Sequence, residues 1–304
     1  MLPNFDAGAF DLAEDAPAKI NLALHVTGQR ADGYHLLDML VTFAGHGDRL
    51  GFRKADGDSF SLSGPFAPGL AAEASGGSNL VLKARDLLRD AASVQGFETF
   101  PIHIHLEKNL PIASGIGGGS ADAAATLRGL QRIWGIALPL ETIAAIALRI
   151  GADVPMCLAS RPLIARGIGE DIEPLPRFPS FAMVLGNPLV GVSTPDVFRH
   201  LPSRDNPPFA FAAQERRDHA GWISLIEGLR NDLEPPARGL CGEIGELSRL
   251  MKAQGALLVR MSGSGATCFG LFNTLGQAEA AAASLHSATP GWYFQATETI
   301  AGGE

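Results

Sequence analysis

Hydrophobic side chains recur at every second position in several stretches of this chain, the pattern of strands that bury one face. The first such stretch alternates Ile20, Leu22, Leu24 and Val26. Similar apolar stretches predict further strands over 36–43, 48–52, 102–106, 181–185, 256–261, 266–272 and 292–297. Residues 1–14 lack the pattern, and we expect them to form a loose leader. The polar stretches 59–78 and 202–220 predict surface loops, the first with one short strand and the second mobile.

Apolar residues spaced three or four positions apart predict helices between these strands. Asn79 and Ser120 are favourable N-cap residues for two helices, Pro139 starts a third, and Gly151 ends it. Helices over 239–252 and 277–285 alternate with the last strands. This order favours an α+β fold with a small C-terminal sandwich and a mostly antiparallel sheet. Prolines at 176 and 179 suggest a boundary, so we expect an N-terminal domain over 1–176 and a C-terminal domain over 177–304.

Composition and charge narrow the class of partner. The chain of 304 residues is 46% hydrophobic and 18% charged, as in ordinary globular proteins, and its formal net charge is −8. That charge argues against nucleic acid and anionic membranes, which require a basic face. No stretch approaches the roughly 20 apolar residues of a membrane span, and the first residues do not form a signal peptide. Three cysteines without a paired motif predict reduced thiols and a cytoplasmic location.

A glycine-rich stretch, PIASGIGGGSA from Pro111 to Ala121, carries the clearest chemical signal. Glycines let a loop approach a ligand closely, and a loop that enters a helix N-terminus presents N–H groups and a positive dipole end. These features suit phosphate. The stretch lacks the Gly-Lys-Ser/Thr of a Walker A loop and misses the dinucleotide spacing. A structural turn that caps a helix is the alternative, and the residues alone leave both open.

Other polar residues give less specific signals. Tyr34 and His35 end a glycine-containing loop and are suited to hold a flat ring, although chance adjacency is common. Asp153 follows a helix end, where it binds a ligand or caps the next turn. His103 and His105 lie on one strand face without a third ligand, so a solvated face is favoured over a metal pair. The stretch Ser262–Ala266 is either a hairpin turn or a second wall against a ligand.

Three segments, in this order, resemble the signatures of the GHMP kinase superfamily: PAKINL from Pro17, PxxxGxGGGSA from Pro111 and SGSGAT from Ser262. Two more, TGQRADGYH from Thr27 and GADVP from Gly151, resemble the branch that phosphorylates a cytidine diphosphate derivative of methylerythritol. The resemblance covers residues 16–297. It implies ATP-dependent phosphorylation of the 2-hydroxyl of 4-diphosphocytidyl-2-C-methyl-D-erythritol, in the non-mevalonate isoprenoid pathway. It also implies two domains, one like ribosomal protein S5 domain 2 and one ferredoxin-like.

The resemblance implies roles for particular residues as well. Lys19 and Asp153 match the catalytic pair: Asp153 accepts or orients the hydroxyl proton, and Lys19 keeps this carboxylate ionised. The nucleotide is expected at the glycine loop and two residues near it, namely Pro111, Ile112, Ala113, Ser114, Gly115, Ile116, Gly117, Gly118, Gly119, Ser120 and Ala121, with Asn79 and Lys108. Asn21 is expected to contact the methylerythritol end. The cytosine ring is expected at Tyr34, His35, Ile168 and Phe198. Because two polyphosphates must be neutralised, Mg²⁺ is expected, with its ligands unassigned.

The chain departs from the usual pattern in the glycine loop. Ala113 and Ser114 replace further glycines, and Ser120-Ala-Asp replaces Ser-Ser-Asn. Asp122 either points along the helix, where it favours the N-terminus, or holds Mg²⁺. A kinase of the homoserine or mevalonate type is a second reading, which the loop with Tyr34 and His35 disfavours. A non-catalytic nucleotide-binding protein is a third, which the joint presence of Lys19 and Asp153 disfavours. Monomer and homodimer both stay open.

Overall fold

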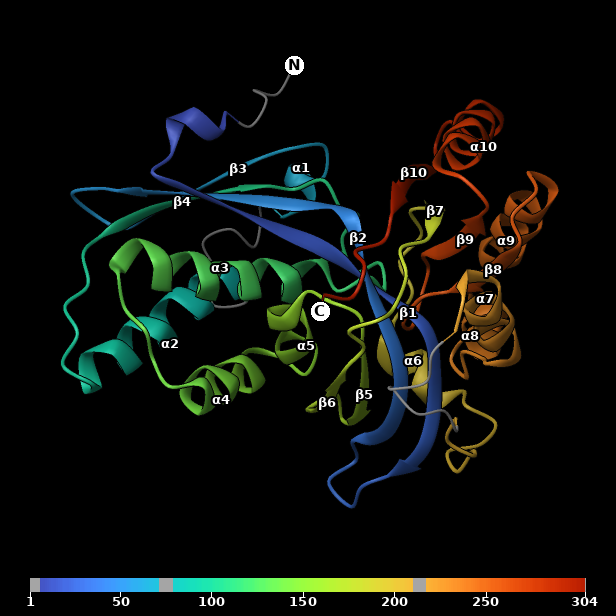
Figure 1. Cartoon of the computed structure of the whole chain (residues 1–304), viewed down its shortest axis with the longest axis horizontal. Coiled ribbons are helices and arrows are strands. Elements are labelled where there is room, and N and C mark those ends of the chain that lie inside the picture. The colour runs from blue at the N-terminus through green and yellow to red at the C-terminus, as the bar shows by residue number, and fades with distance from the viewer. Residues whose placement is uncertain (1–5, 71–78, 210–216, 304) are drawn as a thin grey trace. The chain divides into compact units, whose positions relative to one another are not determined.

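The computed structural model describes residues 6–70, 79–209 and 217–303. The chain forms two compact units: the first comprises 1–18, 47–112 and 117–159, and the second comprises 19–46, 113–116 and 160–304. Two long strands, β1 (Leu12–Gln29) and β2 (His35–Lys54), each contribute to both units (Figure 1). The units are therefore interleaved along the sequence. The division of the sequence at residue 176 stays a prediction.

The first unit packs helices on one side of a sheet (Figure 1). The second half of β2 pairs antiparallel with β4 (Ile102–Glu107), and β4 pairs in parallel with β3 (Ser59–Ser63). As its alternation predicts, β4 buries Ile102, Ile104 and Leu106. The helices of this unit are α1 (Ala67–Leu70), α2 (Leu80–Val94), α3 (Gly118–Trp134), α4 (Leu140–Ile150) and α5 (Val154–Ala159). The α3 helix contacts α2, α4 and α5.

The expectation that residues 1–14 form a loose leader is wrong for residues 7–14. A short 3₁₀ helix, η1 (Ala7–Ala9), precedes β1, and the Asp11 amide donates to Phe52 O over 2.9 Å. The Phe10 ring stacks on His105 with centroids 5.5 Å apart. Gly51 permits this, because a Cβ there would lie 2.5 Å from that ring. A single aromatic residue produces no periodicity, so the sequence pattern did not indicate this docking. Residues 1–5 lie outside the described residues.

The two histidines of β4 belong to a ladder of side chains rather than to a solvated face. His103 bridges Ser59 and Ser61, and His105 bridges Ser61 and Ser63, over distances of 2.7–3.0 Å. The parallel pairing of β3 with β4 places these side chains opposite one another. All four ring nitrogens thus have serine partners.

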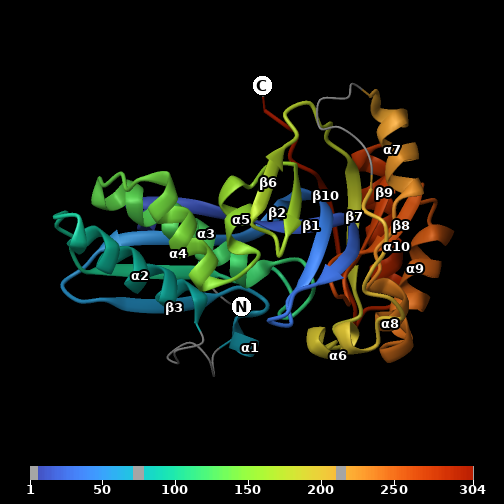
Figure 2. The same cartoon turned by 90° about the horizontal axis from the view of Figure 1, so that it is seen from below.

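The second unit contains the predicted antiparallel sandwich. Its four-stranded sheet has the order β10-β7-β9-β8, with all neighbours antiparallel. These strands are β7 (Ala182–Asn187), β8 (Leu258–Met261), β9 (Cys268–Phe272) and β10 (Tyr293–Glu298). The helices α9 (Glu243–Ala253) and α10 (Leu275–Ala288) pack on this sheet (Figure 2). This arrangement confirms the order of elements expected from the sequence, although α9 begins four residues later than predicted.

The remaining elements of the second unit are strands of the other sheet and three helices. The first half of β2 pairs with β5 (Leu163–Gly167), which turns into β6 (Asp171–Pro174). Three further helices are α6 (Thr194–Arg199), α7 (His219–Gly228) and α8 (Glu234–Leu240). The polar stretch predicted over 202–220 ends within α7, whose buried Trp222 contacts Phe178. Residues 210–216 of that stretch, and 71–78 of the first polar stretch, lie outside the described residues.

Helix ends follow the expected residues with one exception. Asn79 caps α2, since its Oδ1 accepts from the Val81 amide over 2.9 Å, and Gly151 ends α4. The predicted cap Ser120 is wrong. Helix α3 begins three residues earlier than such a cap predicts, and its N-cap is Gly117 at φ 66°, a left-handed conformation that glycine adopts without strain. None of the helices in the described part of the chain has the length and hydrophobicity that crossing a membrane requires.

Candidate functional site

Within the second unit, two glycine-containing loops lie against each other. One is the middle of the predicted phosphate loop, residues 113–116, and the other is the hairpin 262–267 between β8 and β9. The Thr267 amide donates to Ser114 O over 3.2 Å, and the Ser262 hydroxyl donates to Gly115 O over 3.1 Å. The hairpin is thus both a turn and a wall that holds the first loop.

Glycine is required where these loops meet. Gly115 has φ 76°, and a Cβ there would lie 2.6 Å from Ser262 O. Gly263 has φ 57°, and its Cβ would lie 2.5 Å from Gly115 O. Ala113, which replaces a glycine of the usual pattern, has φ 49° and carries backbone strain. The close approach explains why glycines occur in both loops.

Strand β1 holds the predicted residues Lys19 and Asn21 beside these loops. The Lys19 amide donates to Ile116 O over 2.9 Å, and the Asn21 amide donates to the Ser262 hydroxyl over 3.0 Å. Both side chains are buried, and positions two apart on a strand point to the same face. The side-chain amide of Asn21 has no hydrogen-bond partner among the described residues. An unpaired buried amide is costly, so the expected contact of Asn21 with a polar ligand group stays a prediction that this observation favours.

Asn231, which the sequence analysis did not single out, supports the hairpin. Its Nδ2 donates to Met261 O and Gly263 O, each over 2.8 Å, and its Oδ1 accepts from the Leu233 amide. The side chain is buried, with 4% exposure. The polar run Arg230-Asn-Asp was the only signal in the sequence, and nothing in that run indicates a partner 30 residues away.

In the first unit, the expected nucleotide residue Lys108 has carboxylate partners. Its ammonium group is buried and donates to Asp48 and, over 2.8 Å, to Asp122. Asp48 also accepts from the amides of Asn109 and Leu110. Because Lys108 precedes the glycine loop and Asp122 lies in the first turns of α3, this cluster joins the two ends of the loop. Asp48, which the sequence analysis missed, is its centre.

Burial determines the protonation of this cluster. Burial raises the pKa of Asp122 well above its usual value, against the opposing charge of Lys108 and with a further rise from Asp48. Burial alone would lower the pKa of Lys108, but the carboxylates of Asp122 and Asp48 raise it above its usual value. Asp122 contacts Lys108 inside the unit, and its expected roles at the helix N-terminus or on Mg²⁺ stay predictions. Across the described ranges, no three His, Cys, Asp or Glu residues are grouped as a metal site.

Asp153 lies in the first unit, directly before α5. The Val154 amide donates to Gly151 O and the Cys157 amide donates to Asp153 O, each over 3.1 Å. These bonds hold the backbone of Asp153 between the end of α4 and the start of α5, and its side chain is half-buried. Lys19 belongs to the second unit. The predicted meeting of Lys19 and Asp153 at one hydroxyl stays a prediction.

The residues expected around the cytosine ring belong to the second unit. His35 at the start of β2 stacks on Phe198 of α6, with ring centroids 4.4 Å apart at 22°. Both line an open pocket of about 330 Å³. Tyr34, which is 57% exposed, and Ile168 in the turn between β5 and β6 are not among its lining residues. The structure thus places two of the four expected residues in one pocket.

Comparisons with known proteins agree with this arrangement. The models of the GHMP kinases N terminal domain and the GHMP kinases C terminal match residues 79–161 and 210–290. A 4-diphosphocytidyl-2-C-methyl-D-erythritol kinase of Rhizobium leguminosarum bv. trifolii (strain WSM2304) is 64% identical over 98% of this chain and 98% of its own. The protein of that name from Agrobacterium fabrum (strain C58 / ATCC 33970) is 59% identical over 97% of this chain and 98% of its own.

Solved structures extend the likeness to the fold. The crystal structure of a 4-(cytidine 5'-diphospho)-2C-methyl-D-erythritol kinase matches with a TM-score of 0.77 at 33% identity, over 96% of this chain and 100% of that chain. A mevalonate kinase of L. major matches with a TM-score of 0.67 over 96% of this chain and 97% of that chain. At 16% identity, the mevalonate kinase shares only the fold.

Proposed function

Because the chain belongs to the GHMP kinases, in the family of the 4-diphosphocytidyl-2-C-methyl-D-erythritol kinases, we propose that it transfers a phosphoryl group from ATP to the 2-hydroxyl of that cytidine diphosphate alcohol. The observation that best supports this proposal is the unpaired, buried amide of Asn21, next to Lys19 on a strand held against two glycine loops. A polyol offers hydroxyl groups, which are the kind of hydrogen-bond partner that this amide lacks.

The proposed mechanism depends on positioning and charge neutralisation, which phosphoryl transfer mainly requires. The N-cap of α3 is Gly117, without a side-chain cap, so the first amides of α3 suit phosphate oxygens. Asp153 accepts the proton of the substrate hydroxyl. Lys19 favours the ionised form of that carboxylate and offsets the charge that develops on the oxygen.

As a GHMP kinase the protein uses ATP, and we propose Mg²⁺ as its metal ion. With no cluster of three ligating side chains in the described ranges, phosphate oxygens and water would supply most ligands, an arrangement that Mg²⁺ commonly accepts. The ion would neutralise part of the phosphate charge. We also propose a cytoplasmic location, which the three buried, free cysteines support.

A phosphoryl-transfer assay with a substrate panel tests the function. We expect ADP release with the cytidine diphosphate methylerythritol alcohol and none with homoserine or mevalonate. Asp153→Asn is expected to lower kcat by at least about 100-fold, the contribution of a general base, and to change the affinity for ATP by less than about threefold. Asp171→Asn, at an exposed carboxylate, is the control. Unchanged turnover in Asp153→Asn would remove the proposed role of Asp153.

A further inference from the structure

The pocket beside His35 and Phe198 is positively charged within an acidic chain. Two arginines line it, and none of its lining residues is a carboxylate: Gln29, His35, Thr194, Pro195, Phe198, Arg199 and Arg204. The chain as a whole carries a formal charge of −8. A cation-lined pocket on such a protein favours an anionic ligand.

The two arginines differ in their partners. Arg199 forms an ion pair with Asp196 one turn earlier in α6, so its charge is largely offset. Arg204 donates through Nη2 to the carbonyl of Phe198 over 3.3 Å, and no ion pair to it is found in the described chain. A carbonyl leaves the other guanidinium donors available. Arg204 therefore carries the uncompensated charge of this pocket.

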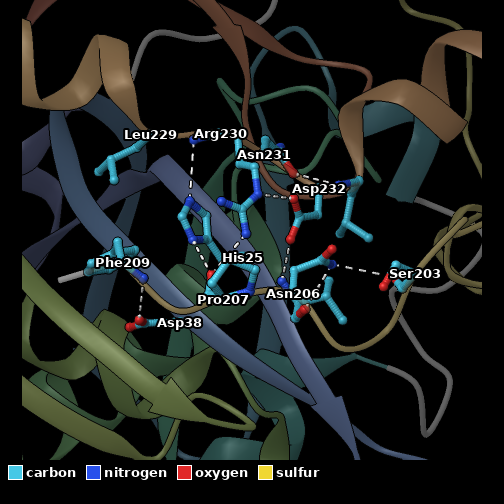
Figure 3. A network of polar contacts seen from close by, with 12 residues as sticks. His25, Asp38, Ser203, Asn206, Pro207, Phe209, Leu229, Arg230, Asn231 and Asp232 are labelled. Atoms are coloured by element: carbon cyan, nitrogen blue, oxygen red, sulfur yellow. Dashed lines mark hydrogen bonds and ion pairs between the residues drawn. The ribbon is translucent and has the colours of Figure 1, made fainter.

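The segment that carries Arg204, residues 201–209, is fastened to β1 and β2 and is called the strap below (Figure 3). Asn206 donates to Val26 O twice, through its amide over 3.1 Å and its Nδ2 over 3.0 Å. The Phe209 amide donates to Asp38 on β2 over 3.2 Å. These bonds flank Arg204 on its C-terminal side, so the strap holds the backbone of Arg204 in place.

His25 and the residues after α7 complete the attachment (Figure 3). The His25 Nε2 accepts from the Arg230 amide over 3.3 Å, which leaves Nδ1 as the donor to Pro207 O over 3.2 Å. Arg230 also donates to Pro207 O over 2.9 Å. Asp232 accepts from the Val26 amide over 2.7 Å and from Arg230 Nε. The strap is thus tied to β1 at two adjacent residues, His25 and Val26.

Of the groups lining the pocket, His35 adds no charge near neutral pH. Burial lowers the pKa of His35, and the nearby charge of Arg204 lowers it further. Its Nε2 is buried without a hydrogen-bond partner among the described residues. The rings of His35 and Phe198 therefore form a neutral wall, and the arginine supplies the positive charge beside it.

We infer that Arg204 binds the diphosphate of the substrate and thereby determines specificity for a nucleoside diphosphate over a nucleoside. This inference depends on the proposed function, in which the cytidine diphosphate alcohol is the anionic substrate, and on the expected position of its cytosine ring at His35 and Phe198. Arginine suits the role because its planar fork of donors matches phosphate oxygens.

The test measures the binding of cytidine, CMP and CDP by calorimetry, with a non-hydrolysable ATP analogue saturating the nucleotide site. In the unaltered protein, CDP is expected to bind more tightly than cytidine. Arg204→Met is expected to reduce the ratio of the two affinities by about tenfold to a hundredfold, the range for a hydrogen bond to a charged group, and to change cytidine binding less than about twofold. Arg204→Lys should retain part of the ratio.

Arg199→Met is the matched control, because it removes an arginine that lines the same pocket but is paired with Asp196. It should change the ratio less than about threefold. The inference would be overturned if Arg204→Met weakened the binding of cytidine and CDP equally, or if it changed neither affinity. It would also be overturned if Arg204→Met and Arg199→Met changed the ratio of the affinities equally. The first two outcomes, together with turnover of the cytidine diphosphate alcohol, would leave the proposed function intact. Absence of that turnover in the unaltered protein would contradict the proposed function instead.

Discussion

At the scale of single residues, the carboxyl group of Asp122 is deeply buried just after the glycine loop, in the first turns of α3. It is 2% exposed and shares Lys108 with Asp48, so two carboxylates compete for one ammonium. The resemblance to the family motif implies an asparagine at this position. A protonated carboxyl group, like an asparagine amide, offers both a donor group and an acceptor without charge. Burial, which raises the pKa of Asp122, favours the neutral form, which resembles that amide.

This protonation predicts a pH effect for Asp122→Asn. An aspartate with a raised pKa keeps its proton to a higher pH in the folded state than in the unfolded chain, which loses the proton above about pH 4. The contribution of Asp122 to stability is therefore lost as the pH rises toward its folded pKa. We expect Asp122→Asn to gain stability relative to the unaltered protein between pH 5 and pH 8. Urea unfolding at several pH values measures this, with the exposed Asp56→Asn as control. Parallel curves for the two proteins would contradict the expectation.

At the scale of elements, the contact between the two glycine loops positions the phosphate loop. Ser262 joins three segments, since it accepts from the Asn21 amide and donates to Gly115 O. Asn231 also holds the hairpin, because its side chain donates to Met261 O and Gly263 O. The loop residues 113–116 therefore depend on a hairpin almost 150 residues later.

The substitution Gly263→Ala tests this dependence. Its Cβ would lie 2.5 Å from Gly115 O, closer than carbon and oxygen approach, so the loops must separate. The control is Gly255→Ala, which has a similar positive φ of 87° but no atom within 4 Å of the added Cβ. We expect Gly255→Ala to cost about 1 kcal/mol from backbone strain alone. Gly263→Ala should cost at least about 1 kcal/mol more, as overpacking does, and should also raise the KM for ATP. Equal effects of the two substitutions would show that the contact does not matter.

At the scale of the whole molecule, burial lowers the pKa of several histidines. In addition to burial, His25 is affected by the charge of Arg230, His35 by Arg204, His103 by Arg53 and His105 by His103. Such residues are found in both units. In His25 and in the ladder of β4, a neutral ring also satisfies the hydrogen bonds that the structure shows. The folded protein thus favours the neutral form of these four histidines.

This preference predicts acid sensitivity. Each lowered pKa means that the unfolded chain takes up a proton below about pH 6.5 while the folded chain does not. Stability is therefore expected to fall as the pH decreases from about 6.5 to 5, with net proton uptake on unfolding. Urea unfolding across this range measures the slope, and it should be steeper in Asp122→Asn, in which the opposing effect of Asp122 is absent. A flat profile would show that the histidines titrate alike in both states.

The sequence by itself determined what depends on near neighbours. Alternation predicts β4 and the antiparallel C-terminal strands, and Asn79 and Gly151 mark helix ends, because caps and periodicity act over a few residues. The motifs around Lys19, the glycine loop and Ser262 also indicate the GHMP kinase family. Only the tertiary structure decided the partners of these groups. Lys108 meets Asp48 from 60 residues away, and Ser262 meets Asn21 from 241 residues away. Packing of distant segments brings such groups together, and no local spacing encodes it.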